Sequence, residues 1–225
     1  VFDNSIDAVS DRDFVADSLY ALALLGIHLS RIGEEVILWS STEFGYLELA
    51  DGYSTGSSMM PQKKNPDIAE LARGKSGRLI GNLTGFLATL KALPLAYNKD
   101  LQEDKEPLFD AVETISRILP AMEGMIRTAN FRVDRMLEQS LSPYIAATDL
   151  AEWLVKRGIP FREAHATIGE LVERSISEGK DFQSLVLEHQ ELGDEAIAIM
   201  KKESIFTSKV THGSASLDKI GDQLR

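Results

Sequence analysis

A segment that combines serines, lysines and a glycine stands directly before a predicted helix start. It runs from Tyr53 to Glu70 and reads Tyr-Ser-Thr-Gly-Ser-Ser-Met-Met-Pro-Gln-Lys-Lys-Asn-Pro-Asp-Ile-Ala-Glu. Asn65 is typical of an N-cap residue, and Pro66 suits the first helical position. The start of a helix has unpaired N–H groups and binds anions well. Most lysine pairs are simply solvated, but Lys63 and Lys64 beside such a helix start favour a site for an anionic small molecule.

Composition excludes several classes of function. The chain has 225 residues, no cysteine and a formal net charge of −11, which argues against nucleic acid or an anionic membrane as a partner. No apolar run is long enough to span a bilayer, and the first residues lack the pattern of a signal peptide. The lack of cysteine agrees with a reducing compartment, so we expect a cytoplasmic protein. We expect no cofactor or metal, because none of the four histidines has metal-ligand spacing.

Three long helices are predicted to position the segment, because apolar residues recur along them at spacings of three and four. The first helix is predicted from Ser10, its N-cap, to about Ser40, and the second from Pro66 to about Leu93. The third should follow the charged segment that ends at Glu106 and run to about Thr128. Its apolar residues keep a seven-residue repeat: Leu108, Val112, Ile115, Leu119, Met122 and Ile126.

The elements after Phe131 are predicted to be shorter. Gly158 and Gly179 act as helix stop signals, and no strand pattern is evident. We therefore predict an all-α fold. A bundle of long helices should form residues 1–138, and a small helical domain should form residues 139–225. The short helices are expected at 133–139, 146–157, 161–177, 181–187, 194–203 and 216–224.

Small residues form a stripe along the second predicted helix. Gly74, Gly77, Gly81 and Gly85 follow one another at spacings of three or four. Each glycine inside a helix costs ~1 kcal/mol relative to alanine, so the stripe needs an offsetting gain. Close approach of another helix supplies one, and we predict a tight contact between helices of different subunits at this face.

The segment from Gly56 to Pro66 resembles the signature of the fumarase/aspartase superfamily, a glycine and two serines followed by Met-Pro-x-Lys-x-Asn-Pro. Within that superfamily, Asp51–Thr55, Tyr97–Glu106 and Asn4–Phe14 resemble the argininosuccinate lyases, to which delta crystallins are similar. Taken alone, a charged run such as the second of these would be read as a solvated turn. The resemblance extends over essentially the whole chain, including Ala147–Ala151.

The resemblance implies β-elimination of a small-molecule substrate, which divides argininosuccinate into arginine and fumarate, by a homotetramer built around long helices. Ser57 resembles the catalytic base, although Ser58 beside it is not separated from it by sequence. Lys63 would stabilise the aci-carboxylate intermediate, and Glu70 would pair with a catalytic histidine of another subunit. The residues expected to hold the substrate are Arg12, Asn65, Tyr97, Gln102 and Lys105.

Nothing in the chain matches the Thr-His pair or the serine-containing segment of the family's N-terminal part. We therefore expect the chain to correspond to the C-terminal portion of the enzyme and to be inactive alone. Two alternatives remain open at this point. One is a structural, crystallin-like or assembly-only helical protein without turnover, and the other is a different lyase of the superfamily, such as an adenylosuccinate lyase.

Overall fold

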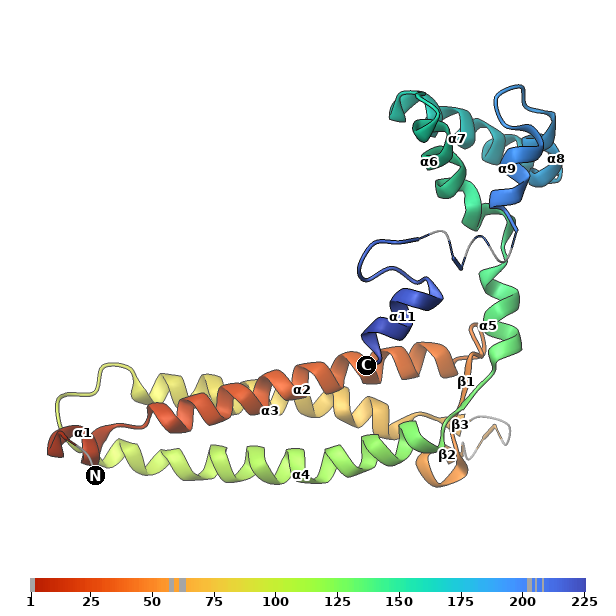
Figure 1. The fold of residues 1–225 in the computed structure, drawn as a ribbon. Helices are drawn as coiled ribbons and strands as arrows, with labels where there is room; N and C mark the ends of the chain where they lie inside the picture. Colours follow the sequence, from red (N-terminus) through yellow and green to blue (C-terminus); the bar gives the residue numbers. More distant parts are fainter. Residues whose placement is uncertain (1–2, 57–58, 61–63, 202–203, 205, 208) are drawn as a thin grey trace. The chain divides into compact units, whose positions relative to one another are not determined.

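The computed structural model describes residues 3–56, 59–60, 64–201, 204, 206–207 and 209–225. The chain divides into two compact units, Val1–Arg135 and Met136–Arg225, and each is described by itself. Helices dominate both units (Figure 1), so the predicted all-α class is confirmed. Within the described residues, no helix has both the length and the apolar character needed to cross a membrane.

Three long helices of the first unit pack side by side (Figure 1). They are joined by short 3₁₀ helices and two-residue strands, which lie mainly at the ends of the bundle. The elements up to residue 140 are α1 (Ser5–Ser10), α2 (Asp13–Ser40), β1 (Leu47–Glu48), η1 (Asp51–Tyr53), β2 (Thr55–Gly56), β3 (Lys64–Asn65), α3 (Asp67–Leu90), η2 (Lys99–Asp104), α4 (Lys105–Thr128), β4 (Asn130–Phe131) and α5 (Val133–Ser140).

The first long helix begins later than predicted, and the assignment of Ser10 as its N-cap is wrong. Ser10 is the last residue of α1, where its hydroxyl donates to the Ile6 carbonyl at 2.8 Å. The Asp11 carboxylate accepts from the Asp13 N–H at 2.8 Å. This local bond between a side chain and the backbone favours a turn, so the chain bends before α2 starts.

The role of Asn65 as an N-cap is also wrong. Asn65 belongs to β3 and pairs with Thr55 of β2, so its backbone is extended rather than poised at a helix start. Helix α3 begins at Asp67, and Pro66 occupies the N-cap position without a side-chain cap. The antiparallel ladder therefore delays the helix by one residue relative to the sequence pattern.

The four strands were not predicted, because two residues are too few to show an alternating pattern. In one pair, β1 joins β4 with Leu47 opposite Phe131, and in the other β2 joins β3 with Gly56 opposite Lys64. Both pairs are antiparallel. Both pairs lie at the end of the bundle where α3 begins, and the first joins segments that are far apart in sequence.

The core of the first unit lies between α2, α3 and α4, as the apolar spacing predicted. Burial of these side chains is the main favourable contribution to folding. The buried members include Val15, Leu19, Ala23, Leu29 and Val36 of α2, Ala69, Ala72, Leu79 and Phe86 of α3, and Ala111, Ile115, Ile118, Met122 and Met125 of α4.

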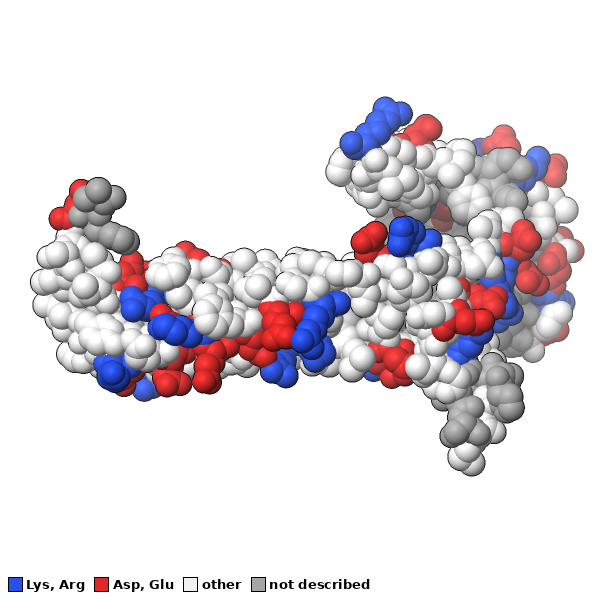
Figure 2. Space-filling view, turned by 90° about the horizontal axis from the view of Figure 1, so that it is seen from below, with Lys and Arg blue, Asp and Glu red and all other residues white. Residues whose placement is uncertain are grey.

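The seven-residue repeat of α4 divides between two faces. Ile115 and Met122 are buried, whereas Val112, Leu119 and Ile126 are 47%, 40% and 39% exposed. Figure 2 shows the bundle from below, with uncharged surface between the acidic and basic side chains. Helix α4 therefore has an apolar row that the described part of this chain leaves uncovered.

Glycines let α2 and α3 approach closely. A Cβ added at Gly33 would lie 2.7 Å from the Ala69 carbonyl oxygen, which is closer than a carbon atom can come. The glycine stripe of α3 lies on a different face. Gly74, Gly77 and Gly81 are exposed, and an added Cβ there would meet nothing within 4 Å in the described part of the chain. Its predicted contact with another subunit stays a prediction.

The second unit is a cluster of shorter helices around its own core. Gly179 ends α7 with a φ of +64°, in the left-handed region that favours glycine, so this predicted stop signal is confirmed. The core includes Leu150, Leu154, Ile168, Leu171, Phe182 and Val186. The elements are η3 (Pro143–Ala146), α6 (Ala147–Lys156), α7 (Phe161–Glu178), α8 (Phe182–Glu188), α9 (Gly193–Ile199) and α11 (Leu217–Gln223).

Candidate active site

The described residues include both ends of the signature segment. The predictions for Ser57, Ser58 and Lys63 lie outside them. Gly56 before the gap and Lys64 after it are paired across the β2–β3 ladder, so the chain leaves and returns at the same place. Strand β3 ends at Asn65, and α3 starts two residues later, at Asp67.

The start of α3 carries two more of the predicted site residues. Glu70 is exposed in the first helical turn, and Asn65 is half-buried in β3. Both line a cleft of about 560 Å³ together with Lys64 and Arg132. Asp67, also in the first turn, accepts a hydrogen bond from the Thr55 hydroxyl. The structure thus brings Asn65 and Glu70 together beside the ends of the signature segment.

Lys64 is the centre of a charge network. Its Nζ lies 2.8 Å from Asp51 Oδ1 and 3.4 Å from Glu48 Oε1, and it donates to the Leu49 carbonyl at 3.4 Å. Arg132 Nη2 donates to the other Glu48 oxygen at 3.2 Å. Hydrogen bonds from Arg132 and Lys64 lower the pKa of Glu48, and the hydrogen bond from Lys64 lowers the pKa of Asp51. Hydrogen bonding to Asp51 raises the pKa of Lys64.

The remaining predicted residues gather around η2 and the start of α4. Arg12 Nε donates to Asp104 Oδ2 at 2.7 Å, and Lys105 Nζ donates to Asp104 Oδ1 at 2.7 Å. Nearby along the chain, Gln102 Nε2 donates to the Tyr97 hydroxyl at 2.6 Å. The structure therefore joins Arg12 to Lys105 through one carboxylate, and Gln102 to Tyr97 directly.

The sequence reading missed Asp104, the acceptor shared by Arg12 and Lys105. Asp104 is only 7% exposed, and Leu101, three residues earlier, is also buried. Residues three apart lie on the same side of a 3₁₀ helix. Burial tends to raise the pKa of Asp104, but hydrogen bonds from Lys105 and Arg12 outweigh it and hold the pKa below its ordinary value of 3.8.

We expect Asp104→Asn to lower the free energy of unfolding by about 1 kcal/mol at neutral pH, because Arg12 and Lys105 lose their ionised acceptor. A carboxylate with a lowered pKa stabilises the fold above its unfolded pKa, and this contribution disappears as the pH falls through the lowered value. Urea unfolding of both proteins from neutral pH to below pH 3.8 should show the difference shrinking. Asp100→Asn, an exposed neighbour in η2, is the control. A difference independent of pH would contradict the role of the carboxylate charge.

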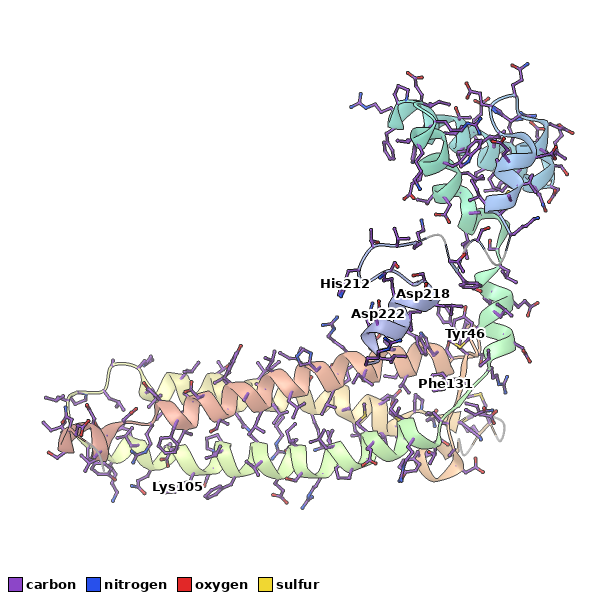
Figure 3. All side chains as sticks on the ribbon, in the orientation of Figure 1. Tyr46, Lys105, Phe131, His212, Asp218 and Asp222 are labelled. Atoms are coloured by element: carbon purple, nitrogen blue, oxygen red, sulfur yellow. The ribbon has the colours of Figure 1, made fainter. Side chains whose placement is uncertain are left out.

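The two groups of site residues lie at opposite ends of the bundle. Asn65 and Glu70 are at the start of α3, whereas η2 contacts the three-helix bundle beyond the end of α3. A helix of 24 residues spans about 36 Å. Figure 3 shows Lys105 where α4 begins and Phe131 beyond the other end of α4. One copy of the described chain therefore does not bring the two groups together.

Comparisons with known protein families match both units. The family described as Lyase matches residues 1–81, and the family described as argininosuccinate lyase C-terminal matches residues 144–209. The first match includes the whole signature segment and Arg12, and the second lies within the small helical unit. Both matches agree with the resemblance stated from the sequence.

Solved structures share the fold. An EDDS lyase crystallised with formate has a TM-score of 0.81 at 27% identity and covers all of this chain and 47% of its own. A class II fumarase from Schistosoma mansoni has a TM-score of 0.69 at 15% identity and covers 88% of this chain and 40% of its own. At that identity the likeness to the fumarase concerns the fold alone.

Curated relatives are much closer in sequence. Argininosuccinate lyase of Mycolicibacterium gilvum is 54% identical over 99% of this chain and 48% of its own length. Argininosuccinate lyase of Moorella thermoacetica is 62% identical over 82% of this chain and 40% of its own length. The chain thus spans about half the length, or less, of these relatives. The chain belongs to the argininosuccinate lyase family of the fumarase/aspartase superfamily.

Proposed function

We propose that this chain is part of an argininosuccinate lyase that divides argininosuccinate into arginine and fumarate. The observation that carries the proposal is the 54% identity, over 99% of the chain, to a relative of that name. The signature from Gly56 to Pro66 supports it, because it supplies the hydroxyls and cations that a β-elimination needs. Lack of cysteine agrees with work in a reducing cytoplasm.

In the proposed reaction, Ser57 accepts the proton from the carbon next to a substrate carboxylate. The electron pair forms an aci-carboxylate, whose extra negative charge Lys63 stabilises. When the carbon–nitrogen bond breaks, the pair returns to form the fumarate double bond, and an acid protonates the nitrogen that leaves as arginine. Glu70 orients a histidine supplied by another subunit. A serine is a weak base in water, so its alkoxide needs the nearby cation and N–H groups.

The remaining residues hold the substrate. Arg12, Gln102, Tyr97 and Lys105 would bind its carboxylates and polar groups from one end of a bundle, and Asn65 would bind a carboxylate from the other end of a different bundle. The separation of the two groups in one chain supports assembly. We propose a homotetramer, in which the glycine stripe of α3 and the uncovered apolar row of α4 become contacts between subunits.

An absorbance assay for fumarate tests the proposal. The chain should release no fumarate alone, because the Thr-His segment of the family is absent from it. It should release fumarate from argininosuccinate when it is joined to the N-terminal portion of a family member, such as the Moorella thermoacetica relative. Helical assembly without turnover in the joined protein would favour the assembly-only alternative. Turnover of adenylosuccinate instead would favour the other lyase.

A further inference from the structure

We propose that Lys64 is a positioning residue of this site, which holds the end of the signature segment in register by binding Asp51 and Glu48. The inference rests on the proposed function. The ammonium has three acceptors: Asp51 of η1 at 2.8 Å, Glu48 of β1 at 3.4 Å, and the Leu49 carbonyl between these elements at 3.4 Å. An ammonium has three donors, so these contacts match its full donor capacity.

The position of Lys64 in β3 explains how it can act on the reaction. Lys64 directly precedes Asn65 in β3, and both residues line the same cleft. The contacts of Lys64 fix the backbone register in which Asn65 lies opposite Thr55. The same contacts fix the point at which the chain returns from the signature segment, since Gly56 is the partner of Lys64.

The network continues into the bundle. Arg132 binds the second oxygen of Glu48 at 3.2 Å, and its N–H donates to the Tyr46 carbonyl at 2.8 Å. Arg132 directly follows β4, which comes from the end of α4 and pairs with β1. A line of charged groups thus connects the end of α4, through β1, to β3.

The charged groups around Lys64 are too exposed to contribute much to the stability of the fold, so their loss should affect the position of the site residues instead. The side chains of Lys64 and Glu48 are 43% and 44% exposed, and that of Asp51 is 91% exposed. Ion pairs this exposed contribute little to the stability of a fold. Turnover is far more sensitive, because a displacement of about 1 Å at a reacting group can cost ~10²-fold in rate. Loss of Lys64 should therefore change the rate without unfolding the protein.

The test compares Lys64→Met and Lys64→Arg in the active assembled enzyme, with argininosuccinate as substrate. We expect Lys64→Met to lower kcat by about 10- to 100-fold, with KM within about threefold of the wild type. The melting temperature should change by about 2 °C or less. Lys64→Arg keeps the charge and should recover most of the lost kcat. The double variant Asp51→Lys with Lys64→Asp should recover part of it.

Arg73→Met is the matched control, because Arg73 of α3 and Glu34 of α2 form an ion pair at 2.7 Å with exposures of 46% and 48% and belong to neither β1 nor β3. It should leave kcat within about twofold of the wild type. Equal losses of kcat in Arg73→Met and Lys64→Met, or wild-type kcat in Lys64→Met, would overturn the inference about Lys64 and leave the proposed function standing. Absence of fumarate release by the wild-type enzyme would instead overturn the proposed function.

Discussion

Replacing Ser57 with alanine is expected to lower kcat for fumarate release by ~10²–10⁴-fold, the usual contribution of a general base. KM should change little, because the substrate is proposed to be held by other residues, including Asn65 and Lys105. The variant removes one hydroxyl from the signature segment, and the backbone pairing of Gly56 with Lys64 should persist. Steady-state kinetics of the assembled enzyme measure both constants, and circular dichroism checks that the helices persist.

Ser58→Ala is the matched control, since it removes the same hydroxyl one residue later. Its turnover should stay within a few-fold of the wild type. The ascending limb of the pH–rate profile should also be lost in Ser57→Ala and kept in Ser58→Ala, because that limb reports the essential base. Near wild-type turnover by Ser57→Ala, with a large loss in Ser58→Ala, would move the base to the second serine.

The helical fold could be predicted from the sequence because its signals are local. Apolar residues three and four apart identified the three long helices, and Gly179 marked the end of α7 through a backbone conformation that only glycine adopts easily. Helix starts were predicted less well. Asp11 and the β2–β3 ladder decide where α2 and α3 begin, and the two-residue strands of the ladder are too short to show a pattern in the sequence.

The polar framework of the site was only partly predictable. The family resemblance predicted Asn65 and Glu70, and the structure places both beside the same cleft. Asp104 was missed because its partner Arg12 is distant in the chain, and within its own segment it reads as one more solvated acid. Arg132 and Glu48 were missed for the same reason, since β1 and β4 pair across most of the unit. A charged residue reveals such a role only when the fold supplies its partner.

The glycines of α2 and α3 look alike in the sequence but differ in what surrounds them. Gly33 of α2 faces the backbone of α3, whereas no atom of the residues that the structure describes lies within 4 Å of a Cβ added at Gly77 of α3. Glycine costs ~1 kcal/mol relative to alanine at either place. At Gly33 the offsetting gain is visible within one chain, and at Gly77 it must come from another molecule if it exists.

Gly33→Val is therefore expected to lower the free energy of unfolding by about 3 kcal/mol, at the upper end of the cost of overpacking. The new Cβ would stand 2.7 Å from the Ala69 carbonyl oxygen, which belongs to the backbone of α3 and cannot move alone. Urea unfolding monitored by circular dichroism measures the change. Stability equal to that of the wild type would show that α2 and α3 separate at little cost, contrary to their packing.

Gly77→Val makes the same substitution on the face of α3 that is predicted to contact another subunit. A Cβ added at Gly77 meets nothing within 4 Å among the described residues, so the helical content should stay unchanged. If the glycine stripe packs against α3 or another helix of a second subunit, the added methyl groups must hold the two backbones apart. Light scattering should then show smaller particles than the wild type. Fumarate release should be lost in proportion, because the two groups of site residues are proposed to meet between chains. A wild-type mass for Gly77→Val would place the subunit contact on another face, and the apolar row of Val112, Leu119 and Ile126 would be the next to test.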